Sequence, residues 1–515
     1  MNTKTKSLWS ATLMVSILII AGKILGFGRV ALIAAYFGAT SNTDAFFLAQ
    51  NMPEMIFPAI CNSLATAFVP LYICYSKEYG KLIGDAYVSY VLLRTSILAI
   101  LLGIIGVVIT PFIIQLFAPG FVGAQLQLAI DLTRLTMGAF VFTMLHHMLY
   151  SILSSNKCYN NPQIAVLFYS ITIIGLVLYF GPGQSMKTLT LISIFGLFMQ
   201  VVALLYFSRK YLCFSLTKKT TENNMMPLIK LALPILLGNS IIGINTIVDK
   251  ALSSTLPLGS LSALSYSNSL TGLVISVFIT ALTTVLYPTM VTSVTEKNYS
   301  KFYQDINNSL SVLSLFLVPI SCITIVSAEN IVTIAFGRGA FDGMAIKYTA
   351  LALACYAPMF AFSGIREVLT RAYFAMQNTR IPAINASIGV VCNVVLSIIL
   401  VNWFGIAGIA LGTSIASFAI AGLLAYSLRV TLPELSLDKY FKTLGTQVIM
   451  GVFSMAILIF LHKIILIQGV LLSFAFDTIV GFSSYFVLLY CIGNEDIDSV
   501  ILIVKSKYKQ LNGKI

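Results

Sequence analysis

Charged residues are scarce in this sequence. Of its 515 residues, 31 are Lys or Arg and 18 are Asp or Glu, so 10% are charged, against roughly 25% in ordinary soluble domains. Apolar residues make up 58%, and the mean hydropathy is +0.93. Since about 20 consecutive apolar residues cross a bilayer as a helix, the composition predicts an all-α polytopic membrane protein. It excludes soluble enzymes and soluble DNA-binding domains.

The motifs of common enzyme classes are also missing. The sequence contains no GxxxxGK[ST], HExxH, GxSxG or CxxC pattern, so it shows no P-loop, zinc-protease or hydrolase signature. Its three histidines, His146, His147 and His462, lie apart from any carboxylate cluster in the sequence. Its eight cysteines are scattered, mostly within apolar runs, as expected for small apolar side chains. We therefore expect a transporter and not an enzyme.

Long apolar runs alternate with short polar segments along the whole chain. They predict about fourteen membrane-spanning helices, centred near residues 20, 57, 100, 140, 170, 197, 240, 277, 313, 358, 391, 418, 450 and 479. Nineteen Lys and Arg residues lie in the termini and in the loops after even-numbered spans, whereas the other loops carry only Lys187, Arg338, Lys347 and Lys463. This asymmetry predicts that both termini are cytoplasmic. It also accounts for most of the net charge of +13, so we expect no nucleic-acid partner.

The two halves of the sequence resemble each other at an offset of about 220 residues. Thr66 to Tyr72 corresponds to Thr284 to Met290, Phe117 to Phe121 corresponds to Phe336 to Phe341, and Leu149 to Pro162 corresponds to Leu369 to Pro382. The offset covers six spans, an even number, so the repeats share one orientation. We predict two parallel six-helix lobes, at residues 1–215 and 226–432, followed by two further helices and a cytoplasmic tail at 433–515. This is a transporter architecture with the substrate site between the lobes.

Two cations in the first span stand out because no acid lies in their own helix. Lys23 and Arg29 are separated by about 9 Å along a helix axis and are accompanied by Gly22, Gly26 and Gly28, which permit close packing or a break in the helix. Unpaired cations at this depth suggest an anionic ligand that carries phosphate. The alternative is that they pair with Asp44 or Glu54 of the second span.

Other ionisable residues within the spans have simpler interpretations. Asp131 and Arg134, at i and i+3, suit a self-neutralising pair on one helix face. The adjacent pairs Asp249/Lys250 and Arg366/Glu367 are interpreted in the same way.

Several short motifs resemble one transporter family along nearly the whole chain. The motifs are Gly26-Phe-Gly-Arg29, Tyr36-Phe-Gly38-Ala, Thr43-Asp44-Ala-Phe-Phe47, Ala67-Phe-Val-Pro70, Ala118-Pro-Gly-Phe121, Val248-Asp249, Phe336-Gly-Arg-Gly339-Ala-Phe341, Tyr373 to Pro382, and Gly405-Ile-Ala-Gly408-Ile-Ala-Leu411. In their order and spacing they resemble the MurJ (MviN) family of lipid II flippases, within the superfamily that includes the MATE exporters.

The resemblance implies fourteen helices in two lobes that form a V around a cationic central cavity, with a groove for a lipid tail beside the last two helices. It implies export of an undecaprenyl-pyrophosphate-linked peptidoglycan precursor by alternating access in a bacterial inner membrane. By position, Lys23 stands where the family usually has Arg, Arg29 matches a cavity Arg, and Asp44 matches an acid at the start of helix 2. With Glu54, these are the predicted substrate-binding residues.

The resemblance also implies a sodium site, with sodium as a coupling ion. The ligands would be Asp249, Asn393, Ser397, the backbone carbonyl of Ile409, and Thr413. Hard oxygen ligands suit such a cation, and Asp249 would supply the negative charge.

Other functions stay open at this point. Asn51, Cys61 and Ser269 differ from the family pattern, which leaves another polyprenyl-linked oligosaccharide (capsule, O-antigen or teichoic type) as an alternative substrate. A MATE-like drug exporter is disfavoured by the cations of the first span, because cationic drugs require acidic and aromatic cavity residues. A membrane scaffold that binds cell-wall synthesis proteins is the third alternative, and such binding is compatible with transport.

Overall fold

All regular structure in the described part of the chain is helical. The computed structural model describes residues 3–212, 225–465, 467–494 and 497, and no β-strand occurs in these ranges. The predicted all-α class is confirmed. The predicted cytoplasmic tail and most of the linker between the predicted lobes lie outside the described residues.

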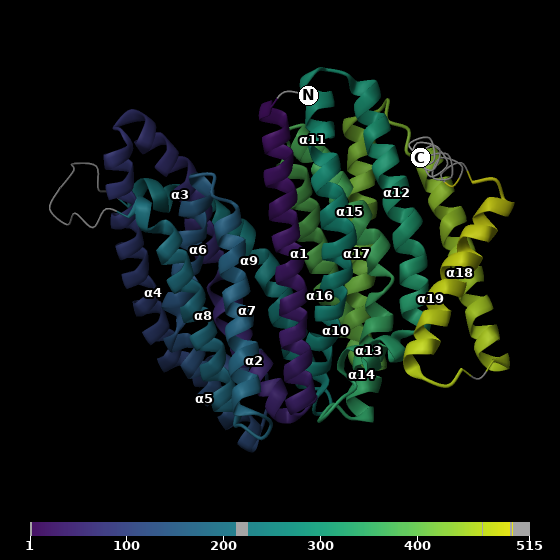
Figure 1. Ribbon diagram of the computed structural model, residues 1–515, viewed down its shortest axis with the longest axis horizontal. Coiled ribbons are helices and arrows are strands. Elements are labelled where there is room, and N and C mark those ends of the chain that lie inside the picture. The colour runs from purple at the N-terminus through teal and green to yellow at the C-terminus, as the bar shows by residue number, and fades with distance from the viewer. Residues whose placement is uncertain (1–2, 213–224, 466, 495–496, 498–515) are drawn as a thin grey trace, which may run out of the picture. The chain divides into compact units, whose positions relative to one another are not determined.

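The chain forms two compact units. The first unit is Met1–Tyr266 with Arg338–Ala345, and the second is Ser267–Gly337 with Ile346–Ile515. The first unit contains α1 (Thr3–Phe37), α2 (Ser41–Ile56), α3 (Pro58–Glu78), α4 (Lys81–Phe117), α5 (Gly123–Gly138), α6 (Phe140–Ser155), α7 (Asn160–Phe180), α8 (Met186–Ser208), the 3₁₀ turn η1 (Arg209–Tyr211), α9 (Met226–Ser254) and the start of α10 (Ser260–Val274) (Figure 1). The second unit contains the end of α10, the π-helical segment η2 (Ile275–Thr280), α11 (Ala281–Thr295), α12 (Tyr299–Val326), α13 (Ala328–Phe336), most of α14 (Gly343–Tyr356), α15 (Met359–Ala375), α16 (Arg380–Phe404), α17 (Ile406–Thr431), α18 (Asp438–Ile464) and α19 (Val470–Cys491).

The helices account for the predicted spans. Among the described residues, ten helices are long and apolar enough to cross a membrane, and three bent helix pairs raise the number to thirteen. In addition, α9 is a 29-residue helix at the position predicted for the seventh span. Each predicted centre falls in a helix or at the break of a bent pair. The chain is therefore a multi-pass membrane protein with a span number close to the predicted fourteen.

Large apolar side chains point outward from these helices. On α4, Val108 is 71% exposed and Phe112 is 70% exposed. Exposing so many large apolar side chains to water would be unfavourable. In a bilayer the exposure has no such cost, because the lipid tails are as apolar as the side chains. These surfaces are therefore suited to contact with lipid.

Two bent pairs at equivalent positions support the internal repeat. The helix axis bends by 43° between α5 and α6, and by 43° between α14 and α15. The breaks lie near residues 139 and 357, which are separated by the predicted offset. Both halves of the chain therefore place the same bend in their fourth span.

The ends of these bent pairs also share one backbone motif. Lys157 and Gln377, 220 residues apart, adopt positive φ values of 60° and 59°. The next amide in each case, from Cys158 or Asn378, donates to the carbonyl five residues earlier at 2.9 Å. This pattern closes a helix C-terminus. The two halves therefore match in a geometry that hydropathy alone does not specify.

The compact units are not divided at the boundary of the repeats. Helix α9, which begins the second repeat, packs against α3 of the first, so the first unit extends through Tyr266. The proximity of helices in space defines the compact units, whereas sequence similarity defines the repeats. The lobe boundaries at 1–215, 226–432 and 433–515, and the V-shaped cavity between the lobes, stay predictions.

Candidate functional site

Helix α1 carries the two predicted cations without a break. It is continuous from Thr3 to Phe37, so Gly22, Gly26 and Gly28 do not mark a break in the helix. A Cβ on Gly22 would make ordinary contact with α7 at 3.8 Å, whereas one on Gly26 or Gly28 would meet nothing within 4 Å. Lys23 is exposed and makes no ion pair within the described part of the chain, and Arg29 is half-buried.

Arg29 is held by an aromatic side chain of α7. Its Cζ lies 4.5 Å from the centroid of the Tyr169 ring, within the range of a cation–π contact. Gln50 of α2 donates from Nε2 to the Tyr169 hydroxyl at 3.2 Å. The Nη1 atom of Arg29 is buried and has no hydrogen-bond partner among the described residues. The guanidinium thus packs on the ring through one face, and Nη1 is left without a hydrogen bond among the described residues.

Tyr169 and Gln50 were not predicted from the sequence. Tyr169 lies in an apolar run, and nothing in that run distinguishes it from the other aromatic residues. Gln50 did offer a signal, because it precedes Glu54 by four residues and therefore lies on the same face of α2.

Glu54 is an acid within electrostatic reach of Arg29. It is exposed, and Arg29 acts on it electrostatically, but the two form no ion pair among the described residues. The alternative in which Arg29 is neutralised by a direct ion pair is therefore not observed in the described part of the chain. Substrate binding by Lys23, Arg29 and Glu54 stays a prediction.

Asp44 caps another helix. One carboxylate oxygen accepts the backbone N–H of Gly259 and the other accepts that of Ser262, each at 2.7 Å. Asp44 is 3% exposed, and α10 begins at Ser260. A carboxylate at this position satisfies free amide donors and complements the helix dipole. The observed role of Asp44 is to join α2 to α10, and its predicted role in substrate binding stays a prediction.

Three turns of the first unit meet beside Asp44. The backbone N–H of Ala340 donates to the carbonyl of Ala35 at 2.7 Å, and the Tyr266 hydroxyl donates to the carbonyl of Gly38 at 2.9 Å. We call these segments the α1–α10 junction: residues 35–44, 259–266 and 338–341. Since α1 and α2 belong to the first sequence repeat and the other segments to the second, the junction ties the two repeats together.

The junction depends on glycine at Gly339, which predicts a sensitive position. Gly339 has φ of +63°, and a Cβ there would lie 2.2 Å from the carbonyl oxygen of Ala35. We expect Gly339→Ala to lower the thermal stability of the detergent-purified protein, because the strained backbone alone costs about 1–3 kcal/mol. Gly343→Ala is the control, since a Cβ there meets nothing within 4 Å. Equal melting temperatures for the two variants would contradict the close approach.

Four of the predicted sodium ligands lie on α16 and α17 of the second unit, and the fifth lies on α9 of the first unit. Ser397 Oγ donates to Asn393 Oδ1 at 3.1 Å, and Thr413 Oγ1 donates to the Ile409 carbonyl at 3.2 Å. A Cβ on Gly412 would lie 2.8 Å from Ser397 Oγ, so α16 and α17 nearly touch here. These four oxygen donors are hard ligands of the type that sodium prefers.

The fifth predicted ligand, Asp249, belongs to α9 in the first unit. Asn245 donates to its carboxylate at 3.5 Å. The neighbouring Lys250 was expected to pair with Asp249. The two charges do interact electrostatically. The Lys250 amino group, however, donates its hydrogen bond to Ser265 Oγ at 2.8 Å. The donor chemistry fits sodium at α16 and α17, and the sodium site as a whole stays a prediction.

Two other expected pairs are formed with different partners. Asp131 was predicted to pair with Arg134 of its own helix, but its ion pair is with Lys187 of α8, at 2.8 Å. Glu367 pairs with Arg371 at 2.8 Å and not with the adjacent Arg366. For Glu367 the geometry explains the correction, because adjacent residues point to different sides of a helix, whereas residues four apart share a face. For Asp131 the partner comes from a different helix, which spacing along α5 does not indicate.

Comparisons with known proteins agree on one family. Residues 33–480 match the family model described as "Lipid II flippase MurJ". The chain is 27% identical over 415 residues to a probable lipid II flippase MurJ of Buchnera aphidicola from Acyrthosiphon pisum, covering 78% of this chain and 80% of the relative. It is 25% identical over 517 residues to that of Bdellovibrio bacteriovorus, covering 96% and 97%.

Solved structures show the same fold. A lipid II flippase MurJ in an inward closed conformation superposes with a TM-score of 0.78 at 25% identity, covering 93% of this chain and 98% of that chain. An inward-facing MATE family multidrug transporter superposes with a TM-score of 0.70 at 13% identity, covering 82% and 98%. The second likeness shows a shared fold.

Proposed function

Because this chain belongs to the lipid II flippase MurJ family, whose model matches residues 33–480, we propose that it moves lipid II from the cytoplasmic to the outer leaflet. Lipid II is the undecaprenyl-pyrophosphate-linked peptidoglycan precursor. One observation in the site carries the proposal. Arg29 is a half-buried cation, and its Nη1 atom is buried without a hydrogen-bond partner among the described residues. A pyrophosphate supplies the oxygens that such a donor matches. No covalent bond is made or broken in this reaction.

Transport by alternating access requires an opening and a closing step. In our proposal, Arg29 and Lys23 bind the pyrophosphate while the polyprenyl tail stays in lipid. The α1–α10 junction is the closure that must separate for release on the other side. Since binding of the anion neutralises the cations, it lowers the cost of passing them through a closed state.

The proposed setting is a bacterial inner membrane with both termini cytoplasmic. The distribution of Lys and Arg between alternate loops supports this orientation. In this orientation the loop between α18 and α19 faces outward. Cell-wall synthesis proteins are proposed partners that would receive the exported precursor.

Sodium is proposed as the coupling ion. When bound, it would supply positive charge to compensate the Asp249 carboxylate. The oxygens of Asn393, Ser397, Ile409 and Thr413 would complete its ligand set, and the hard-oxygen chemistry of these groups supports the proposal.

Complementation tests the proposed substrate. The endogenous MurJ of a tractable bacterium is depleted, this chain is expressed, and surface exposure of lipid II is assayed. We expect rescue by the wild-type chain and no rescue by the Lys23→Gln, Arg29→Gln double variant at equal membrane abundance. Full expression without rescue would contradict lipid II as substrate and favour another polyprenyl-linked oligosaccharide.

Tyr169 provides a prediction specific to this geometry. Tyr169→Leu removes the ring beneath Arg29, and a cation–π contact of about 0.5–2 kcal/mol corresponds to a loss of about twofold to 30-fold in transport rate. Tyr169→Phe keeps the ring and loses only the hydroxyl contact with Gln50, so we expect nearly normal transport. Tyr179→Leu, at an exposed position of the same helix, controls for general damage to α7. Equal losses in the Phe and Leu variants would show that the ring does not position Arg29.

A further inference from the structure

A fully buried carboxylate lies in the second unit, on a helix that carries none of the residues described above. Asp477 of α19 is 0% exposed and stands within one of the apolar candidate membrane spans, Val470–Cys491. An ionisable residue in such a segment is costly to bury and is usually retained for a function. The proposed flipping mechanism does not use it.

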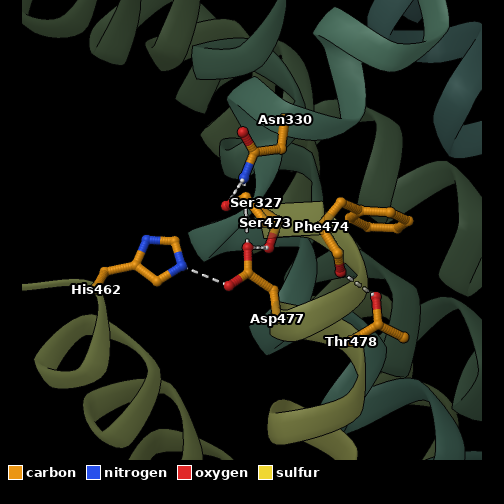
Figure 2. A network of polar contacts seen from close by, with 7 residues as sticks. All are labelled: Ser327, Asn330, His462, Ser473, Phe474, Asp477 and Thr478. Carbon is orange, nitrogen blue, oxygen red and sulfur yellow. Dashed lines mark hydrogen bonds and ion pairs between the residues drawn. The ribbon is translucent and has the colours of Figure 1, made fainter. Parts of the chain in front are cut away.

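Asp477 is the centre of a network that joins several helices (Figure 2). Its Oδ2 accepts hydrogen bonds from Ser327 Oγ at 2.7 Å and from Asn330 Nδ2 at 3.4 Å. Its Oδ1 lies 2.5 Å from Nε2 of His462. Asn330 Nδ2 also donates to Ser473 Oγ at 3.0 Å. The carboxylate therefore connects the turn between α12 and α13 to both C-terminal helices.

His462 connects this buried group to the protein surface, two residues from the end of the candidate span Asp438–Ile464. It lies in the last turn of α18, and its side chain is 34% exposed, whereas that of Asp477 is fully enclosed. A proton can therefore be exchanged between solvent and the imidazole without opening the helices. Histidine is the side chain whose charge ordinarily changes between about pH 5 and pH 8.

The charged residues on the helices around the network are few. Helix α13 carries Glu329 and α18 carries Lys463, and both are exposed. Within its described range, α19 has no charged residue besides Asp477, and α12 has none in its last two turns. The charge of His462 is therefore the main charge that can balance Asp477.

We propose that His462 and Asp477 form a proton-binding site that controls how firmly α19 is held against α12 and α13. With a proton on the imidazole, the two side chains form a neutral ion pair joined by a charge-assisted hydrogen bond. When the imidazole loses that proton to water, a buried carboxylate remains with only neutral donors, which is unfavourable. The contact of α19 with its neighbours is tighter in the protonated state.

The site has a place in the proposed topology. The loop after α18 follows an odd-numbered span, so the predicted orientation exposes His462 to the outer side of the membrane. The C-terminal helices are thus sensitive to the proton concentration on the side to which substrate is delivered. The proton-binding site itself depends neither on this orientation nor on lipid II flipping. The experiment below measures amide exchange, so it can fail without affecting the proposed transport function.

Hydrogen–deuterium exchange of the full chain in lipid nanodiscs tests the site. After correction for the intrinsic pH dependence of exchange, we expect amides of 470–485 in the wild type to exchange about fivefold faster at pH 8 than at pH 5.5. His462→Gln keeps a neutral donor but cannot titrate, and it should remove this pH dependence. Lys463→Gln, a charge change at the next residue, should retain it. Ser327→Ala should speed exchange at both pH values and also retain the dependence.

Two results would overturn the proposal. One is a wild-type exchange rate in 470–485 that does not change between pH 5.5 and pH 8. The other is an unchanged pH dependence in His462→Gln. If that variant cannot be purified, Asp477→Asn takes its place, because an amide in place of the carboxylate must also abolish the pH dependence.

Discussion

Arg29→Gln is expected to lower the rate of lipid II transport by about 100-fold. Two charge-assisted hydrogen bonds to a pyrophosphate contribute about 1.5–3 kcal/mol each, and every 1.4 kcal/mol is a factor of about ten. Glutamine is too short to reach the same position and carries no charge. It also loses the contact of Arg29 with the Tyr169 ring. The measurement is surface exposure of lipid II at matched membrane abundance.

The controls separate charge, geometry and fold. Arg29→Lys keeps the charge but not the planar donor fork, so we expect an intermediate loss of about tenfold. Arg94→Gln removes an exposed Arg that also lies over a tyrosine ring, at 5.5 Å from Tyr90, and it should transport normally. If Arg29→Gln transported as well as Arg94→Gln, Arg29 would not be a substrate contact.

Asp44→Asn is expected to open the α1–α10 junction. The carboxylate of Asp44 accepts two backbone N–H groups at the start of α10. An amide nitrogen cannot accept either one, so one buried donor loses its partner and the interaction with the helix dipole is lost. Together these changes cost about 2–5 kcal/mol, which is enough to change the ratio of closed to open junctions more than about 20-fold.

Spin labels can measure this opening directly. Thr40 and Leu258 are both exposed and lie on the two sides of the Asp44 contacts. Electron–electron distance measurements between labels at these positions should show one short distance in the wild type and a large long-distance population in Asp44→Asn. Asp131→Asn is the control, since it breaks a partly exposed ion pair with Lys187 that contributes about 0–1 kcal/mol. If Asp44→Asn left the distance distribution unchanged, the Asp44 contacts would not be what holds the α1–α10 junction closed.

The sequence was most informative where one physical effect dominates. Burial in lipid requires long apolar helices, so the spans and the all-α class could be predicted from hydropathy. The repeat could be predicted because Pro162 and Pro382 mark the same helix start twice. The structure then showed that the match extends to the backbone, at the positive φ of Lys157 and Gln377.

The sequence was less informative where partners are distant along the chain. Asp44 and Gly259 are 215 residues apart, and no local pattern indicates that a carboxylate will cap a helix in the other repeat. Tyr169 was missed because one aromatic residue in an apolar span resembles its neighbours until the fold places Arg29 over it.

Histidine chemistry was missed for the same reason. His462 was interpreted as remote from carboxylates, yet it contacts Asp477 across the α18–α19 hairpin. The signal in the sequence was Asp477 itself, the only charged residue in the described range of α19. Its apolar surroundings required a partner, but sequence spacing could not identify which residue supplied it.

Translocation by the purified chain is the most direct test of the proposed function. The protein is reconstituted into liposomes with labelled lipid II, and the fraction of lipid II that becomes accessible to a membrane-impermeant reagent is followed over time. We predict translocation well above protein-free liposomes and about 100-fold slower translocation with Arg29→Gln. Folded wild-type protein that leaves the accessible fraction at the protein-free level would contradict lipid II flipping by this chain.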